Sequence, residues 1–224
     1  MNVVSAERSE GEGEYAEGAR TVVVPIAPPL GGTGSPVSLL TGSLVLVWVL
    51  SEVAIRVYAV ARGAPARVPR GPDRGSWVVL VIGIAGIIVL STVDRANPLL
   101  GLPPLGVLYL GDALMGLGIA VRVWAITVLG RFFTTRVMIQ KGHQLITKGP
   151  YRWVRHPSYT GALTTLIGLS LAYGSLLGTL LALTVGATCF GYRIHVEEKA
   201  LAEGFGKEYE EYRRHTRRLI PGVY

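Results

Sequence analysis

The chain has 224 residues, half of them apolar, a formal charge of +7 and a mean hydropathy of +0.42. A nucleic-acid-binding domain of this charge would gather its cations on one face. Here the cations fall mostly in two loops and the C-terminal tail, between long apolar blocks that carry few charges. Such blocks are typical of membrane-spanning helices. The composition therefore predicts an all-α, polytopic integral membrane protein that contacts membrane lipids and not nucleic acid.

Residues 1–35 precede the first apolar block and are rich in glutamate and proline. No apolar stretch follows a basic start in this segment, so it does not resemble a secretory signal peptide. Its composition cannot support a packed core, and we expect a disordered tail.

Three apolar blocks follow within residues 36–129, and each is long enough to cross a bilayer. The predicted spans cover about 37–60, 76–93 and 104–129. Glu52 and Arg56 stand four residues apart in the first span, so they share a helix face and can pair. We interpret them as a structural ion pair. In the third span, a small-residue surface for close helix packing is predicted at Gly106, Gly111, Gly116, Gly118 and Gly130.

The last apolar block runs from Pro157 to about Ile194, roughly 38 residues, which is too long for one span. Gly174 and Ser175 mark a turn near its middle. We therefore predict a helical hairpin of residues 158–172 and 176–194. The expected total is five spans, followed by an amphipathic C-terminal helix on the cytoplasmic membrane surface. Tyr209 and Tyr212 would anchor that helix at the interface.

The distribution of lysine and arginine among the loops predicts the orientation. Four arginines lie in the loop at 61–75 but only one in the loop at 94–103, and the segment 130–156 carries six cations and no acid. With both basic segments in the cytoplasm, five spans place the N-terminus outside and the C-terminus inside. In a prokaryote the membrane would be the plasma membrane.

Two polar clusters flank the predicted hairpin. The first, residues 140–161, contains His156 just before the hairpin begins. The second follows the hairpin, where Arg193 and Glu197 stand one helical turn apart and share a face. Because a hairpin returns the chain to the membrane surface from which it started, we expect the two clusters to lie side by side. A cation, a carboxylate, a histidine and tyrosines then converge at the cytoplasmic interface.

These clusters resemble the isoprenylcysteine carboxyl methyltransferase family and, more distantly, the membrane phospholipid methyltransferases. The first shared pattern, Gly-x-Tyr-x-x-x-Arg-His-Pro-x-Tyr-x-Gly, runs here from Gly149 to Gly161. The second, Glu-Glu-x-x-Leu-x-x-x-Phe-Gly-x-x-Tyr-x-x-Tyr, runs from Glu197 to Tyr212. The resemblance covers about residues 130–222, and we interpret residues 130–224 as the catalytic region.

The resemblance implies S-adenosyl-L-methionine as the cofactor and a lipidic or small-molecule methyl acceptor, such as an isoprenylcysteine-like carboxylate. It gives Arg193 the catalytic, acceptor-binding role. An arginine suits that role on physical grounds also, because its planar guanidinium can hold a carboxylate by two parallel hydrogen bonds. The cofactor contacts that the resemblance implies are Gln140, His143, Gln144, Leu145, Ile146, Tyr151, His156, Pro157, Ser158, Tyr159 and Glu197.

Two other functions fit part of the pattern. NADPH-dependent membrane reductases of sterols or related lipids share a similar Arg-His-Pro-x-Tyr pattern, but Arg193 followed by Glu197 and Glu198 favours the methyltransferase. A transporter or scaffold would place polar residues near mid-bilayer, whereas most of those here gather at one surface. No histidine spacing suits a metal site, so none is expected. The group that carries the acceptor carboxylate stays open.

Overall fold

The computed structural model describes residues 36–61, 76–96, 103–133, 145–220 and 222. The regular elements within these residues are all helices, which confirms the predicted all-α class. The predicted disordered tail at 1–35 and most of the basic loop at 61–75 lie outside the described residues.

Three long helices carry the N-terminal apolar blocks. α1 (Pro36–Ala61), α2 (Ser76–Ala96) and α3 (Leu105–Leu129) agree with the predicted spans to within a few residues. A short 3-10 helix, η1 (Gly130–Phe132), follows α3, and a second, η2 (Gly149–Arg152), precedes the hairpin.

The predicted hairpin is present. Its first helix is α4 (Pro157–Ala172). The second is a continuous helical stretch made of α5 (Leu176–Val185), a π-helical turn η3 (Gly186–Phe190) and α6 (Gly191–Phe205). This stretch runs past the predicted end at Ile194 and carries the second polar cluster on its last turns. α7 (Lys207–His215) follows after a sharp change of direction.

The hairpin turns at the predicted position. Gly174 adopts a φ of 76°, which glycine tolerates without steric cost, and its N–H donates to the carbonyl of Leu171 at 2.8 Å. The Ser175 hydroxyl then caps α5 by accepting the N–H of Gly178 at 2.8 Å. The side chain of Ser175 thus satisfies one of the free donors at the start of the second helix.

Within the described residues, four helical segments are long and apolar enough to cross a membrane: Val37–Tyr58, Val78–Ala96, Leu105–Leu129 and Leu176–Phe205. The first two also expose large apolar side chains to their surroundings, among them Leu46, Val57 and Ile82, which suits a surface that faces lipid. The chain is therefore a multi-pass membrane protein. With 16 residues, α4 is shorter than these four segments.

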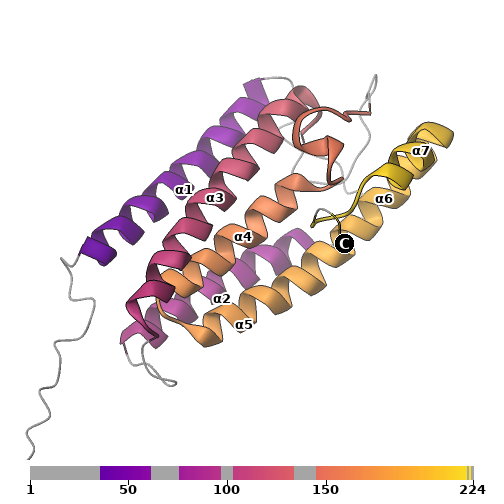
Figure 1. Cartoon of the computed structure of the whole chain (residues 1–224). Helices are drawn as coiled ribbons and strands as arrows, with labels where there is room; N and C mark the ends of the chain where they lie inside the picture. The colour runs from indigo at the N-terminus through magenta and orange to yellow at the C-terminus, as the bar shows by residue number, and fades with distance from the viewer. Residues whose placement is uncertain (1–35, 62–75, 97–102, 134–144, 221, 223–224) are drawn as a thin grey trace, which may run out of the picture. The chain divides into compact units, whose positions relative to one another are not determined.

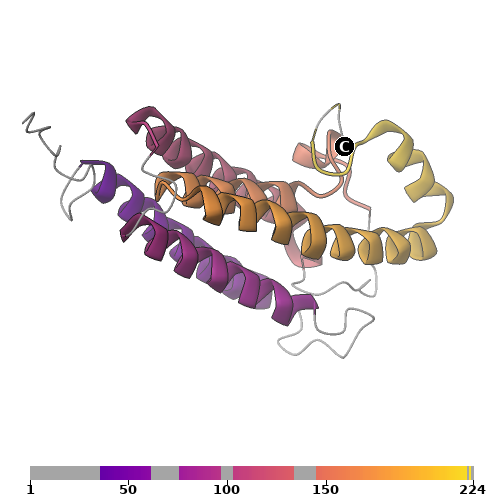
Figure 2. The ribbon, with the colours of Figure 1, turned by 90° about the horizontal axis from the view of Figure 1, so that it is seen from below.

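Figures 1 and 2 show α4 between α3 and α5, with α1 beside α3 and α2 beside α5. Consecutive helices from α1 to α5 are antiparallel. The ends of α1 and α3 therefore meet the beginnings of α2 and α4 at one end of the bundle, where α5 continues into α6. The described residues of the two polar clusters lie at this end, with His156 just before α4 and with Arg193 and Glu197 on α6.

The tight packing of α3 on α4 depends on glycine. A Cβ at Gly118 would lie 2.5 Å from the backbone nitrogen of Thr165, and one at Gly161 would lie 2.6 Å from the backbone nitrogen of Arg122. Gly111 meets the backbone of α4 in the same way. The predicted small-residue surface on α3 is therefore used at Gly111 and Gly118 to bring the two backbones together.

Candidate active site

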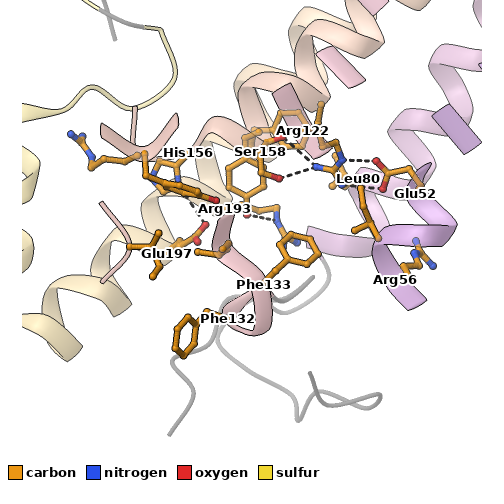
Figure 3. A pocket seen from close by; sticks show the side chains of 18 of the residues that line it. Glu52, Arg56, Leu80, Arg122, Phe132, Phe133, His156, Ser158, Arg193 and Glu197 are labelled. Carbon is orange, nitrogen blue, oxygen red and sulfur yellow. Dashed lines mark hydrogen bonds and ion pairs between the residues drawn. The ribbon is translucent and has the colours of Figure 1, made fainter. Parts of the chain in front are cut away.

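A cavity of about 530 Å³ lies at this end of the bundle, and Figure 3 shows part of its lining. Its size is in the range of sites that hold a small molecule or cofactor, which is about 300–1,000 Å³. The membrane helices supply an apolar portion that includes Trp48, Val53, Leu80, Ile84 and Leu166. The start of α4, together with η2 and α6, supplies a polar portion that includes Tyr151, His156, Ser158, Tyr159, Arg193 and Glu197.

Most of the described residues that the sequence assigned to the site line this cavity. They are Leu145, Ile146, Tyr151, His156, Ser158, Tyr159, Arg193 and Glu197. Pro157 is fully buried at the first position of α4, where proline's fixed φ suits the helix start. Gln140, His143 and Gln144 lie outside the described residues.

The loop before α4 is held by the C-terminal segment of the chain. The N–H of Arg155 donates to the carbonyl of Arg217 at 2.7 Å, and the N–H of His156 donates to the carbonyl of Arg218 at 3.0 Å. In return, the N–H of Arg217 donates to the carbonyl of Trp153 at 3.2 Å. This short run of backbone hydrogen bonds fixes the position of His156 at the edge of the cavity.

His156 lies between two carboxylates of α6. Its Nδ1 is 3.6 Å from Glu197 Oε2, and its Nε2 is 3.5 Å from Glu198 Oε1, so the contacts are ion pairs and not close hydrogen bonds. Burial by itself lowers the pKa of His156, but the two carboxylates outweigh it and raise the pKa above its ordinary value. A positive charge on the imidazole is therefore favoured at this position.

The two adjacent glutamates have different surroundings. Glu198 is buried, and its carboxylate is bound by Arg155 at 2.8 Å and by Arg218 at 3.1 Å. Glu197 is paired with His156, and 34% of its side chain is exposed where it lines the cavity. Glu198 thus ties the loop to α6, while Glu197 presents negative charge to the cavity.

An aromatic stack extends from His156 along the cavity. The rings of His156 and Tyr159 are 5.8 Å apart, and those of Tyr159 and Phe190 are 5.3 Å apart, each pair nearly parallel. Arg193 Nε donates to the hydroxyl of Tyr159 at 3.4 Å, and Arg193 is itself buried. The hairpin therefore brings the two polar clusters together, as the sequence predicted.

Tyr209 and Tyr212 belong to the cavity wall, so their predicted role as interfacial anchors is wrong. Tyr209 is fully buried, and the hydroxyl of Tyr212 donates to the carbonyl of Tyr151 at 2.7 Å. Gly206, with a φ of 53°, breaks the helix between α6 and α7 and folds α7 back over the site. Burial raises the pKa of Tyr209 and of Tyr212, so both keep their hydroxyl protons.

Glu52 lines the cavity from α1, and its partner is not the predicted Arg56. Its carboxylate accepts hydrogen bonds from Nε and Nη2 of Arg122 on α3. A pair four residues apart on one helix adds only a few tenths of a kcal/mol, whereas a guanidinium across the helix interface offers two parallel donors. Arg122 is a site residue that sequence patterns missed, because its partners lie on other helices.

These features define a class: a multi-pass helical membrane protein whose cavity combines a polar portion at one end of the bundle with an apolar portion between the membrane helices. Within that class, the model of the isoprenylcysteine carboxyl methyltransferase (ICMT) family matches residues 112–203. The resemblance to this family predicted from the two motifs is therefore confirmed over this segment.

Individual relatives agree with the family match. A probable protein-S-isoprenylcysteine O-methyltransferase of Oryza sativa subsp. indica is 36% identical over 117 residues, which are 51% of this chain and 61% of the rice protein. The protein-S-isoprenylcysteine O-methyltransferase of Schizosaccharomyces pombe is 37% identical over 107 residues, 42% of this chain and 45% of the yeast protein. The chain spans about half the length of the curated relatives it matches.

A solved structure shares the fold. The eukaryotic intramembrane Ras methyltransferase ICMT superposes with a TM-score of 0.64 at 22% sequence identity. The superposition covers 89% of this chain and 70% of that one. It therefore includes helices on the N-terminal side of the segment that the family model matches.

Proposed function

We propose that this protein is a membrane-embedded, S-adenosyl-L-methionine-dependent methyltransferase that acts on the carboxylate of an isoprenylcysteine-like or other lipidic acceptor. The observation that carries the proposal is the position of Arg193 and Glu197. They have opposite charges, lie one turn apart on α6, and line one cavity whose other portion is apolar. The family match over residues 112–203 supports the same activity.

The polar portion of the cavity has the groups that such a cofactor needs. Glu197 offers a partly exposed carboxylate to a ligand that carries a positive sulfonium and an ammonium group. The rings of Tyr159 and Phe190 offer flat surfaces to an adenine. S-adenosyl-L-methionine would supply an electrophilic methyl group there. We propose Leu145, Ile146, Tyr151, His156, Pro157, Ser158, Tyr159 and Glu197 as cofactor contacts, together with Gln140, His143 and Gln144.

The acceptor is proposed to lie with its carboxylate at Arg193 and its lipid portion among the apolar helices. Arg193 would hold this carboxylate toward the methyl group that bound S-adenosyl-L-methionine supplies, and methyl transfer would leave S-adenosylhomocysteine as the second product. No proton is transferred, so the residues of the site need only bind and align the two reactants. Arg193 is suited to this task because a guanidinium holds a carboxylate in a defined plane.

We propose that α4 is a fifth span, with the N-terminus outside and the site at the cytoplasmic surface. At about 1.5 Å per residue, α4 is roughly 24 Å long, and it packs along α3 and α5 as Figure 1 shows. In this arrangement residues 36–129 form three spans, residues 130–224 form the catalytic region, and α7 lies on the cytoplasmic membrane surface.

Cysteine labelling tests this topology in a Cys189→Ser background. A cysteine at Leu105, at the start of α3, should react with a membrane-impermeant reagent added from outside. A cysteine at Lys207, at the start of α7, should react only after the membrane is opened. The reverse pattern would refute the orientation, and reaction of both positions from one side would refute the odd number of spans.

Calorimetric titration of the purified protein tests the activity class. S-adenosylhomocysteine should bind and NADPH should not, because the partly exposed carboxylate of Glu197 can pair with the ammonium group of S-adenosylhomocysteine. Binding of NADPH without binding of S-adenosylhomocysteine would favour a membrane reductase instead. Incubation of the protein with labelled S-adenosyl-L-methionine and lipid extracts would then identify the acceptor by the label it receives.

A further inference from the structure

A chain of polar contacts crosses three helices beside the cavity. Arg122 of α3 lies at its centre, between Glu52 of α1 and Ser158 of α4 (Figure 3). The Arg122 side chain is 18% exposed and that of Glu52 is 28% exposed, so the pair is largely shielded from its surroundings. All three residues line the cavity.

The guanidinium of Arg122 donates hydrogen bonds to residues of two other helices. Its Nε and Nη2 donate to the two carboxylate oxygens of Glu52. Its Nη1 donates to the backbone carbonyl of Ser158 at 3.2 Å and to the Ser158 hydroxyl at 3.1 Å. The planar guanidinium of Arg122 thus contacts both the carboxylate of Glu52, which neutralises its charge, and the first turn of α4.

Arg122 contacts α4 at Ser158, next to the residues proposed to bind the cofactor. Ser158 follows His156 by two residues and directly precedes Tyr159, so Arg122 holds the turn that carries four proposed cofactor contacts, residues 156–159. The family model begins at residue 112 and does not include α1. Glu52 nevertheless reaches the site from α1 through Arg122.

We propose that Glu52 and Arg122 are positioning residues for the active site, which hold the first turn of α4 in the geometry that binds the cofactor. This inference rests on the proposed methyltransferase function. α1 is then a functional part of the site and not only a membrane anchor.

A charged pair suits this task near a membrane. A guanidinium and a carboxylate that are shielded from water are strongly disfavoured when separated, so each holds the other in place. Lysine could replace the charge of Arg122, but its single ammonium group cannot contact the carboxylate of Glu52 and both oxygens of Ser158 with the same planar geometry. The substitution Arg122→Lys therefore keeps the positive charge and removes the planar hydrogen-bonding geometry.

The chain offers a matched control at the other end of the same two helices. The hydroxyl of Thr41 on α1 donates to Asp112 Oδ1 on α3 at 2.8 Å, and both residues are buried. Neither lines the cavity. The substitution Thr41→Val therefore removes a polar α1–α3 contact without touching Ser158.

The test compares melting temperature, affinity for S-adenosylhomocysteine and methyl-transfer kinetics in the wild type and in Arg122→Lys, Glu52→Gln and Thr41→Val. Arg122→Lys should keep most of the melting temperature but lose at least fivefold in affinity and raise the KM for the cofactor. Glu52→Gln should shift affinity in the same direction. Thr41→Val should lower the melting temperature and leave the affinity of the folded protein unchanged.

The controls separate this inference from the proposed function. If the wild type binds S-adenosylhomocysteine and both Arg122→Lys and Glu52→Gln bind it with wild-type affinity, the positioning role is refuted and the function stands. The role is equally refuted if both variants behave as Thr41→Val does, with loss of stability alone. If the wild type itself does not bind the cofactor analogue, the proposed function fails and this inference fails with it.

Discussion

Arg155 donates from Nε to Oε1 of Glu198 at 2.8 Å, and only 8% of each side chain is exposed. The two residues are separated by the whole hairpin, so their contact connects the loop before α4 to the helix that follows α5. Arg218 binds the second oxygen of Glu198 at 3.1 Å and adds the C-terminal segment. One buried carboxylate thus joins the three segments that surround His156.

Replacement of Glu198 by glutamine should destabilise the fold more than any loss of a surface ion pair. Removing one partner of a buried pair leaves an uncompensated charge and costs about 3–5 kcal/mol. Glu210, whose partner Arg213 is about half exposed, is the matched control, and its replacement by glutamine should cost no more than about 1 kcal/mol. Thermal unfolding of both variants measures the difference, and equal melting temperatures would contradict the structural role of Glu198.

The stability that His156 contributes should depend on pH in a defined direction. Its pKa in the folded protein is raised above the ordinary value of 6.5, because Glu197 and Glu198 outweigh the effect of burial. The stabilisation is therefore fully present below that ordinary value and is lost as the pH rises through the raised pKa. The difference in melting temperature between the wild type and His156→Asn should shrink as the pH rises above the ordinary pKa of 6.5. A difference that grows with pH would show that the imidazole is buried in its neutral form.

Substitutions at Arg193 and at Glu197 should impair different steps of the reaction. Arg193→Lys keeps the charge but loses the planar fork, so it should impair the acceptor step and leave cofactor affinity nearly intact. Glu197→Gln removes the carboxylate that faces the cavity and should weaken the cofactor complex itself. Titration with S-adenosylhomocysteine and melting temperatures on both variants measure these effects. Equal destabilisation of the two variants with unaltered affinity would show that Arg193 and Glu197 only stabilise the fold.

Gly168 should be intolerant of a single methyl group. A Cβ there would meet the backbone nitrogen of Met115 on α3, which cannot move without separating the two helices. Gly168→Ala should therefore destabilise the protein by about 1–3 kcal/mol. Gly106→Ala on α3 adds the same methyl where no described atom lies within 4 Å and should be neutral or stabilising. Similar melting temperatures for the two variants would contradict the close approach of α3 and α4.

The helices and the hairpin could be predicted from the sequence because each depends on neighbouring residues. Long apolar blocks must satisfy their own backbone hydrogen bonds in a membrane, and helices do so locally. The turn at Gly174 and Ser175 is equally local, since it needs only a positive φ and a hydroxyl that caps the next helix. Because the hairpin returns the chain to its starting side, the meeting of His156 with Glu197 also followed from the order of the segments.

Only the tertiary structure decided which faces those helices present to one another. Periodicity identifies the residues that share a face of one helix, but not the rotation of that helix against its neighbours. For this reason Glu52 binds Arg122 and not Arg56, and Tyr209 and Tyr212 line the cavity and do not anchor α7. The division of labour between Glu197 and Glu198 has the same origin. Two adjacent glutamates look equivalent in the sequence, but they point about 100° apart on α6, so one meets Arg155 and Arg218 while the other meets the cavity.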